Sequence, residues 1–264
     1  MRAPAVRPPA VAGTFYPAPP ERLAAAVAGY LRDGVGETGA PPKALIAPHA
    51  GYLYSGPVAG SAFRALQASA AGIRRVVLLG PSHFVAFEGL ALPAWKAFAT
   101  PLGDVPVSAE ARETLAGLPQ VVTSDRPHAR EHSLEVELPF LQCVLGAFEI
   151  VPLAVGDAEP GQVAKVLERL WGGDETLVVV SSDLSHYLDY DSARRRDAAT
   201  AAAIVALDDR ALGAEDACGC NPIRGLLVAA RRHALTARQL DLRNSGDTAG
   251  ARDAVVGYGA FTFA

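Results

Sequence analysis

Short, strongly apolar runs alternate with amphipathic stretches along this chain, and that alternation limits its fold more than any other feature. The apolar runs predict buried strands over residues 43–47, 75–80, 149–155, 176–181 and 254–263. Helical periodicity precedes and separates them, over residues 20–33, 56–68, 108–115, 161–171, 192–207 and 223–232. Strands without a polar face favour a mainly parallel sheet that helices cover on both sides. The sequence therefore predicts an α/β fold.

Length and charge narrow the class of protein further. The chain has 264 residues and no linker or repeat divides it, so we expect one domain over residues 1–264. Its 24 Lys and Arg residues nearly balance 28 Asp and Glu residues, which leaves no global field to attract nucleic acid or an anionic membrane. The chain shows neither a membrane span nor a signal peptide in its sequence, and we expect a cytoplasmic protein.

Histidines stand where the predicted strands end. His49 and His83 each follow one apolar run, and Asp183 and His186 follow another. Ligands of open α/β sheets bind beyond the carboxyl ends of the strands, and neighbouring parallel strands lie about 4.8 Å apart. Imidazole is both a common metal ligand and a proton carrier near neutral pH. We therefore predict a single histidine-centred active site at this edge of the sheet.

A second polar cluster covers residues 131–137. Ser133 could cap a helix, with acidic residues in the first turn, although Pro139 argues against a straight helix here. Alternatively, His132 and Glu135 point into the histidine pocket, as acid and base or as partners of metal-bound histidines. Both readings stay open at this stage.

Near the C-terminus, residues 244–250 follow a short predicted strand and have the composition of a turn. Asp247 or Thr248 could reach the histidine pocket from this position, or could serve only in a local Asx turn. The nearby pair Cys218 and Cys220 could hold a soft metal, but small buried side chains are the commoner use of such residues. Three cysteines in all do not suggest a disulfide framework or a four-thiolate zinc site.

Several familiar catalytic signatures are missing from the sequence. It has no Walker A motif, no GxGxxG opening a helix after a strand, no GxSxG elbow and no HExxH. Nucleotide-phosphate binding, serine hydrolysis and zinc-protease activity therefore lose their usual support, which leaves the histidine-centred site.

Several short motifs occur in order over essentially the whole chain: PAVAGTFYP at 9–17, APHAGY at 47–52 with YSG at 54–56, GPSH at 80–83, EHSLE at 131–135, SSD at 181–183 with His186, and CG at 218–219 with PI at 222–223. Together they resemble the Memo family, the Memo-like proteins that include protein B of the AmmeMemoRadiSam system. The resemblance implies a class III extradiol dioxygenase-like fold, which belongs to non-haem iron enzymes with a parallel-sheet core. It also implies AMMECR-type and radical SAM proteins as partners.

The resemblance also implies roles for individual residues. His49 and His83 would bind a metal, with Asp183 and His186 beside them and His186 acting as an acid/base. A triad of two histidines and one carboxylate suits Fe(II), and Asp247 or Asp183 could supply the carboxylate. We therefore expect iron, with copper or zinc as alternatives, because imidazole ligands discriminate weakly among these metals.

Three functions follow from this reading, each on an unknown small-molecule or peptide substrate. The first is an Fe(II)-dependent oxidoreductase in which His186 moves protons. The second is a module that binds a peptide or partner protein without catalysis. The third is metal-assisted hydrolysis with His186 as the base.

Overall fold

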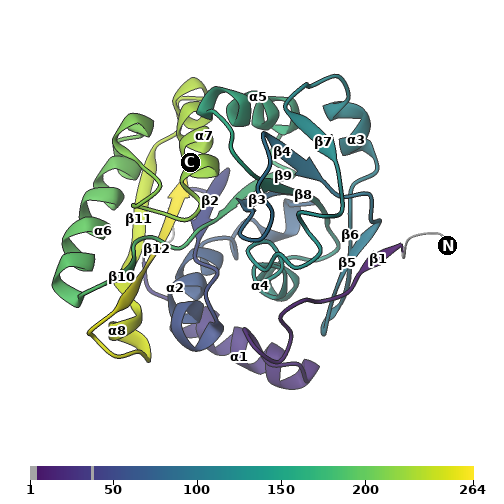
Figure 1. The fold of residues 1–264 in the computed structure, drawn as a ribbon. Coiled ribbons are helices and arrows are strands. Elements are labelled where there is room, and N and C mark those ends of the chain that lie inside the picture. Colours follow the sequence, from purple (N-terminus) through teal and green to yellow (C-terminus); the bar gives the residue numbers. More distant parts are fainter. Residues whose placement is uncertain (1–4, 37–38) are drawn as a thin grey trace.

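The computed structural model describes residues 5–36 and 39–264, and its central feature is a nine-stranded sheet (Figure 1). Eight strands lie side by side in the order β10 (His186–Leu188), β12 (Val255–Phe263), β2 (Ala44–Ala47), β9 (Thr176–Ser181), β3 (Arg75–Pro81), β8 (Glu149–Val155), β4 (Leu90–Leu92) and β7 (Val121–Thr123). The ninth, β11 (Ala237–Asn244), also pairs with β12. All five predicted strands are confirmed, within one residue at each end.

The sheet is mixed, which corrects the prediction of a mainly parallel one. Its centre, β2–β9–β3–β8, is parallel as predicted. β12 runs antiparallel to β2, to β10 and to β11, and β4 runs antiparallel to β8. β11 and β12 are joined by a short connection, which permits only antiparallel pairing. Apolar runs show that a strand is buried but not which way it runs, so this reversal was not visible in the sequence.

Helices cover both faces of the sheet, and the described residues form eight of them with two 3₁₀ turns. They are α1 (Pro20–Asp33), α2 (Tyr52–Arg64), α3 (Glu110–Leu115), α4 (Leu138–Val144), α5 (Pro160–Leu170), α6 (Tyr190–Val205), α7 (Cys220–Arg232) and α8 (Ser245–Thr248), with 3₁₀ turns at Ala70–Gly72 and Asp209–Ala211. Along β3, Val77 and Leu79 pack with α5 and α7, whereas Val76 and Leu78 pack with α1, α2 and α4. This alternation gives the two-sided core that strands without a polar face require.

The predicted helix bounds shift by up to four residues, most at α2, and the helix in the loop region after residue 131 starts later than its candidate cap. α2 spans Tyr52–Arg64 instead of residues 56–68, with Gly51 as its N-cap and Pro57 inside the helix. Ser133 does not cap α4, contrary to one reading of the sequence: the helix begins at Leu138 with Glu137 as its N-cap, and Pro139 stands in its first turn, where a missing N–H costs nothing. None of the described helices is both long and apolar enough to cross a bilayer.

A small second sheet ties the N-terminal segment to the rest of the molecule. It contains β1 (Val6–Arg7), β5 (Ala97–Thr100) and β6 (Gly103–Pro106), with β1 parallel to β5. Arg7 is fully buried there, and its guanidinium donates to the main-chain carbonyls of His128 and Glu131. The segment before α1 thereby braces the loop that leads to α4.

Candidate metal centre

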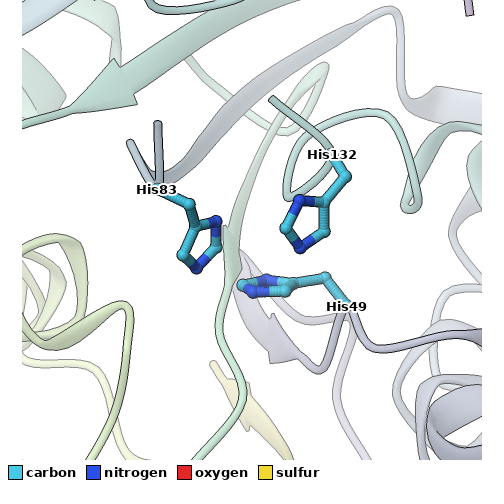
Figure 2. Close-up of side chains that lie close together, drawn as sticks. All are labelled: His49, His83 and His132. Atoms are coloured by element: carbon cyan, nitrogen blue, oxygen red, sulfur yellow. The ribbon is translucent and has the colours of Figure 1, made fainter. Parts of the chain in front are cut away.

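Three imidazoles from distant parts of the chain converge beyond the carboxyl ends of the central strands (Figure 2). His49 follows β2, His83 follows β3, and His132 lies in the loop before α4. One ligand nitrogen of each lies within 4.8 Å of the other two. The ring centroids are 5.3 Å apart for His49 and His83, 5.5 Å for His49 and His132, and 4.7 Å for His83 and His132. This spacing allows one metal ion to contact all three rings.

The sheet explains why the first two histidines meet. β2 and β3 both pair in parallel with β9, so their carboxyl ends point to the same edge of the sheet. The prediction that His49 and His83 lie close together is thus confirmed. His132 was predicted to reach this pocket as an acid/base or as a partner of metal-bound histidines. The structure makes it a third ligand candidate.

Burial keeps two of the three imidazoles neutral. His49 is buried, and desolvation, followed by the neighbouring His83 and His132, lowers its pKa well below the ordinary value of 6.5. Desolvation also lowers the pKa of His132 to about 4, although the charge of Glu131 opposes this change. A neutral imidazole offers the lone pair that a metal needs. At neutral pH these two rings are therefore ready to bind a cation.

Glu131 orients the ring of His83 and fixes the loop that carries His132. Its carboxylate lies 2.8 Å from His83 Nδ1 and accepts from the backbone N–H groups of His83, His132 and Ser133. Burial by itself would raise the pKa of Glu131, but these contacts outweigh it and lower the pKa to about 2. Because the carboxylate only accepts hydrogen bonds, His83 Nδ1 carries the proton and Nε2 keeps its lone pair.

Ser181, the last residue of β9, orients His49 in the same way. Its Oγ lies 2.8 Å from His49 Nδ1, donates to the carbonyl of Ser133 at 2.7 Å and contacts Glu137 Oε1 at 2.6 Å. The single hydroxyl hydrogen is directed to one of these oxygens, so His49 Nδ1–H donates to Ser181, and His49 Nε2 carries the lone pair that faces the Cys218 thiol. Both rings therefore have fixed tautomers that suit metal binding.

Cys218 also belongs to this site, and sequence analysis had not assigned it a clear role. Its Sγ lies 3.4 Å from His49 Nε2. Burial first, and then the charge of Asp183, raises the pKa of this thiol to about 12, so Cys218 is protonated. Cys220 instead packs into the hydrophobic core, so the two cysteines do not act as a pair. The sequence signals that pointed to Cys218 were its spacing from Cys220 and the family motif that begins at this residue.

Asp183 and His186 lie beside the cluster, as predicted, but in separate hydrogen-bonding roles. The Asp183 carboxylate accepts from the backbone N–H groups of His49 and Ala50 and so fixes the turn after β2. Burial raises its pKa to about 6 against the opposing effect of His186. His186 Nδ1 lies 2.9 Å from the carbonyl of Leu184, and no hydrogen bond joins it to Asp183 in the described chain.

Two predicted site residues are held elsewhere. The Glu135 carboxylate is buried against the N-terminal segment, where it pairs with Arg7 at 2.6 Å and accepts from the Tyr16 hydroxyl at 2.6 Å. It therefore does not act as a base in the pocket. Asp247 accepts from the Tyr190 hydroxyl and from the backbone N–H of Asn244, as part of a capping box at α8. The structure does not bring Asp247 to the imidazoles, because local turn contacts occupy its carboxylate.

Acidification is expected to destabilise the metal-free protein between pH 6.5 and about 4. Desolvation lowers the pKa of His128 to about 4, as it does for His132, so the unfolded chain binds more protons than the folded one below pH 6.5. Stability is then lost as the pH falls through this window, by on the order of 2–3 kcal/mol for each histidine. Urea unfolding between pH 4 and 8 checks this, and His128→Gln should flatten the slope. An unchanged slope would contradict it.

Comparison with known proteins agrees with the family resemblance of the sequence motifs. A model of the Memo family, described as "Memo-like protein", matches residues 7–262. MEMO1 family proteins from Aeropyrum pernix and Methanopyrus kandleri are 37% and 36% identical to this chain, each over 97% of it and 98% of the relative. A MEMO1 family protein from Aquifex aeolicus is 35% identical over 96% of this chain and 97% of its own. The chain therefore belongs to the Memo family.

Proposed function

We propose that this protein is a metal-dependent oxidoreductase that binds one Fe(II) through His49, His83 and His132. The observation that carries the proposal is the convergence of three imidazole nitrogens within 4.8 Å of one another. The donor set fits such an ion, because two of the rings are neutral and the tautomers of His49 and His83 are fixed from behind by Ser181 and Glu131. The set holds nitrogen donors only, in place of the two histidines and one carboxylate expected from sequence.

The side chains around the cluster would supply proton handling. Bound Fe(II) would supply redox chemistry toward dioxygen that amino-acid side chains lack. His186 is the acid/base: its Nδ1–H donates to the carbonyl of Leu184, which leaves Nε2 as the acceptor for a substrate proton. Asp183 positions His49 by accepting from its backbone N–H, and among the described residues it forms no hydrogen bond with His186. His83 is partly exposed, so substrate can approach the cluster from solvent on that side.

A second candidate is metal-assisted hydrolysis. It is favoured by the all-imidazole donor set, since three histidines with an open fourth position also form catalytic zinc centres that activate water. In that case His186 would again take the substrate-side proton, but the reaction would need no dioxygen. Oxygen consumption separates the two candidates.

Metal content tests the proposal. Protein purified anaerobically and loaded with Fe(II) is expected to hold about one iron per chain, and His49→Ala combined with His83→Ala should hold less than about a tenth of that. His186→Ala is the matched control, since it should keep the iron but lose oxygen consumption in the presence of ascorbate. Elemental analysis and an oxygen electrode give the two readouts.

Two results would contradict the proposal in different ways. Equal iron content in the wild type and the double variant would show that His49 and His83 do not bind the metal. Full iron without oxygen consumption, together with hydrolysis of test esters, would favour the second candidate. Full iron with neither activity would favour the non-catalytic module that the sequence left open.

A further inference from the structure

A cavity of about 590 Å³ lies at the carboxyl ends of β3 and β8, and Cys218 connects it to the histidine cluster. Pro81 and Ser82, directly before His83, form one wall. Cys218, whose thiol lies 3.4 Å from His49 Nε2, forms another. Cavities of a few hundred Å³ are the size that small ligands occupy. The cavity and the proposed metal centre therefore share a boundary.

The lining of this cavity is apolar with two carboxylates. Its described apolar residues are Pro81, Val85, Ala86, Phe87, Val155 and Pro222. The charged side chains among the described lining residues are Glu88 and Asp157, both on exposed residues. The polar neighbours Ser82 and Asn221 are already bonded, to the carbonyls of Val85 and Gly156. The charged groups of the cavity wall are thus both carboxylates, which carry negative charge.

The two carboxylates are held next to each other but have no cationic partner. Glu88 and Asp157 face each other across a parallel β-bridge, fixed by the hydrogen bond from Gly89 N to the Asp157 carbonyl at 2.7 Å. Neither side chain forms an ion pair or a hydrogen bond with any part of the chain that the structure describes. Both also line a second cavity of about 280 Å³, together with Glu159. Covering such carboxylates with a neutral or anionic ligand would cost free energy, whereas a cation would compensate them.

We propose that this cavity is the substrate site of the metal centre and takes a small molecule with an apolar body and a protonated amine. The apolar body lies along Val85, Phe87 and Pro222, and the ammonium group lies between Glu88 and Asp157. This arrangement places the opposite end of the molecule toward Cys218 and the histidines. The assignment of the cavity to the metal centre rests on the proposed function above, whereas the preference for an amine rests on the cavity itself.

Three isosteric probes test the charge preference on metal-free protein. Phenethylamine, 2-phenylethanol and phenylacetate share a ring and differ in charge. We expect phenethylamine to bind about fivefold more tightly than 2-phenylethanol, and phenylacetate to bind weakest. Glu88→Gln combined with Asp157→Asn should remove the difference between amine and alcohol, while Glu113→Gln on α3, outside the cavity, should keep it. Ala86→Phe should weaken the binding of both the amine and the alcohol, because the larger side chain fills part of the cavity. Calorimetric or NMR titration measures each affinity.

The outcomes separate the cavity from the metal centre. Equal affinity for the three probes, or an amine preference that survives the double carboxylate variant, would overturn the proposal. Because the probes are titrated against metal-free protein, the amine preference is measured whether or not iron binds, so failure of the metal centre would not be mistaken for failure of the cavity. In Co(II)-loaded protein, the ring protons of bound phenethylamine should broaden. Binding without broadening would place the amine away from the metal and overturn the assignment as its substrate site.

Discussion

Replacing Arg7 with methionine is expected to lower the free energy of unfolding by about 3–5 kcal/mol. Arg7 and Glu135 form an ion pair at 2.6 Å in which both side chains are almost fully buried. Methionine preserves much of the volume of Arg7 but leaves the Glu135 carboxylate buried without its cation, and leaves the carbonyls of His128 and Glu131 without their donor. Urea unfolding at pH 7 measures the loss.

An exposed ion pair provides the control for this prediction. Arg32 and Asp33 lie 3.0 Å apart with both side chains largely exposed, so Arg32→Met should cost no more than about 0.5 kcal/mol. Glu135→Gln in the Arg7→Met background should recover part of the lost stability, because it removes the unpaired charge. Equal effects of Arg7→Met and Arg32→Met would show that the buried pair does not brace the N-terminal segment.

Replacing Glu131 with glutamine is expected to weaken metal binding by about 10–100-fold. The carboxylate uses Oε1 for His83 Nδ1 and for two backbone N–H groups, and Oε2 for the backbone N–H of His83. A glutamine must turn its NH₂ toward one of these donors, so at least one bond is lost and the orientation of the His83 ring is released. Titration with Co(II), followed through its visible absorption, measures the affinity.

Glu131→Gln should also change how the free energy of unfolding depends on pH in acid. The folded-state pKa of Glu131 is lowered to about 2, so its contribution is fully present above about pH 4.5 and is lost as the pH falls toward 2. Glu131→Gln should remove this pH dependence. Glu110→Gln, at an exposed surface pair with Arg75, is the matched control for both measurements. Unchanged Co(II) affinity in Glu131→Gln would mean that His83 does not need its carboxylate partner.

Much of the candidate site was predictable because it follows from sheet topology. His49 and His83 follow buried parallel strands, and any such pair on either side of one shared neighbour must end at the same edge. The apolar runs identified those strands within a residue. What they could not show is direction, so the antiparallel edge formed by β12 was not predicted.

The residues that sequence analysis misplaced depend on contacts without a periodic pattern. The loop before α4 has no repeating apolar spacing, so the sequence left open whether His132 and Glu135 both point into the pocket; His132 does, and Glu135 does not. The partner of Glu135 is Arg7, 128 residues earlier, a pairing that no local pattern reveals. Asp247 was misplaced for a different reason. Its carboxylate takes part in a local capping box at α8, which is the simpler use of an aspartate in a turn.

The N-terminal brace also sets an order of events during synthesis. β1 leaves the ribosome before its partners β5 and Glu135, so Arg7 must wait unpaired until the 128 residues up to Glu135 have been added. The strands β2 and β3 must likewise wait for β9, which lies between them. The histidine pocket is therefore a late product of folding, and a nascent chain that ends before residue 181 cannot hold a metal in this geometry.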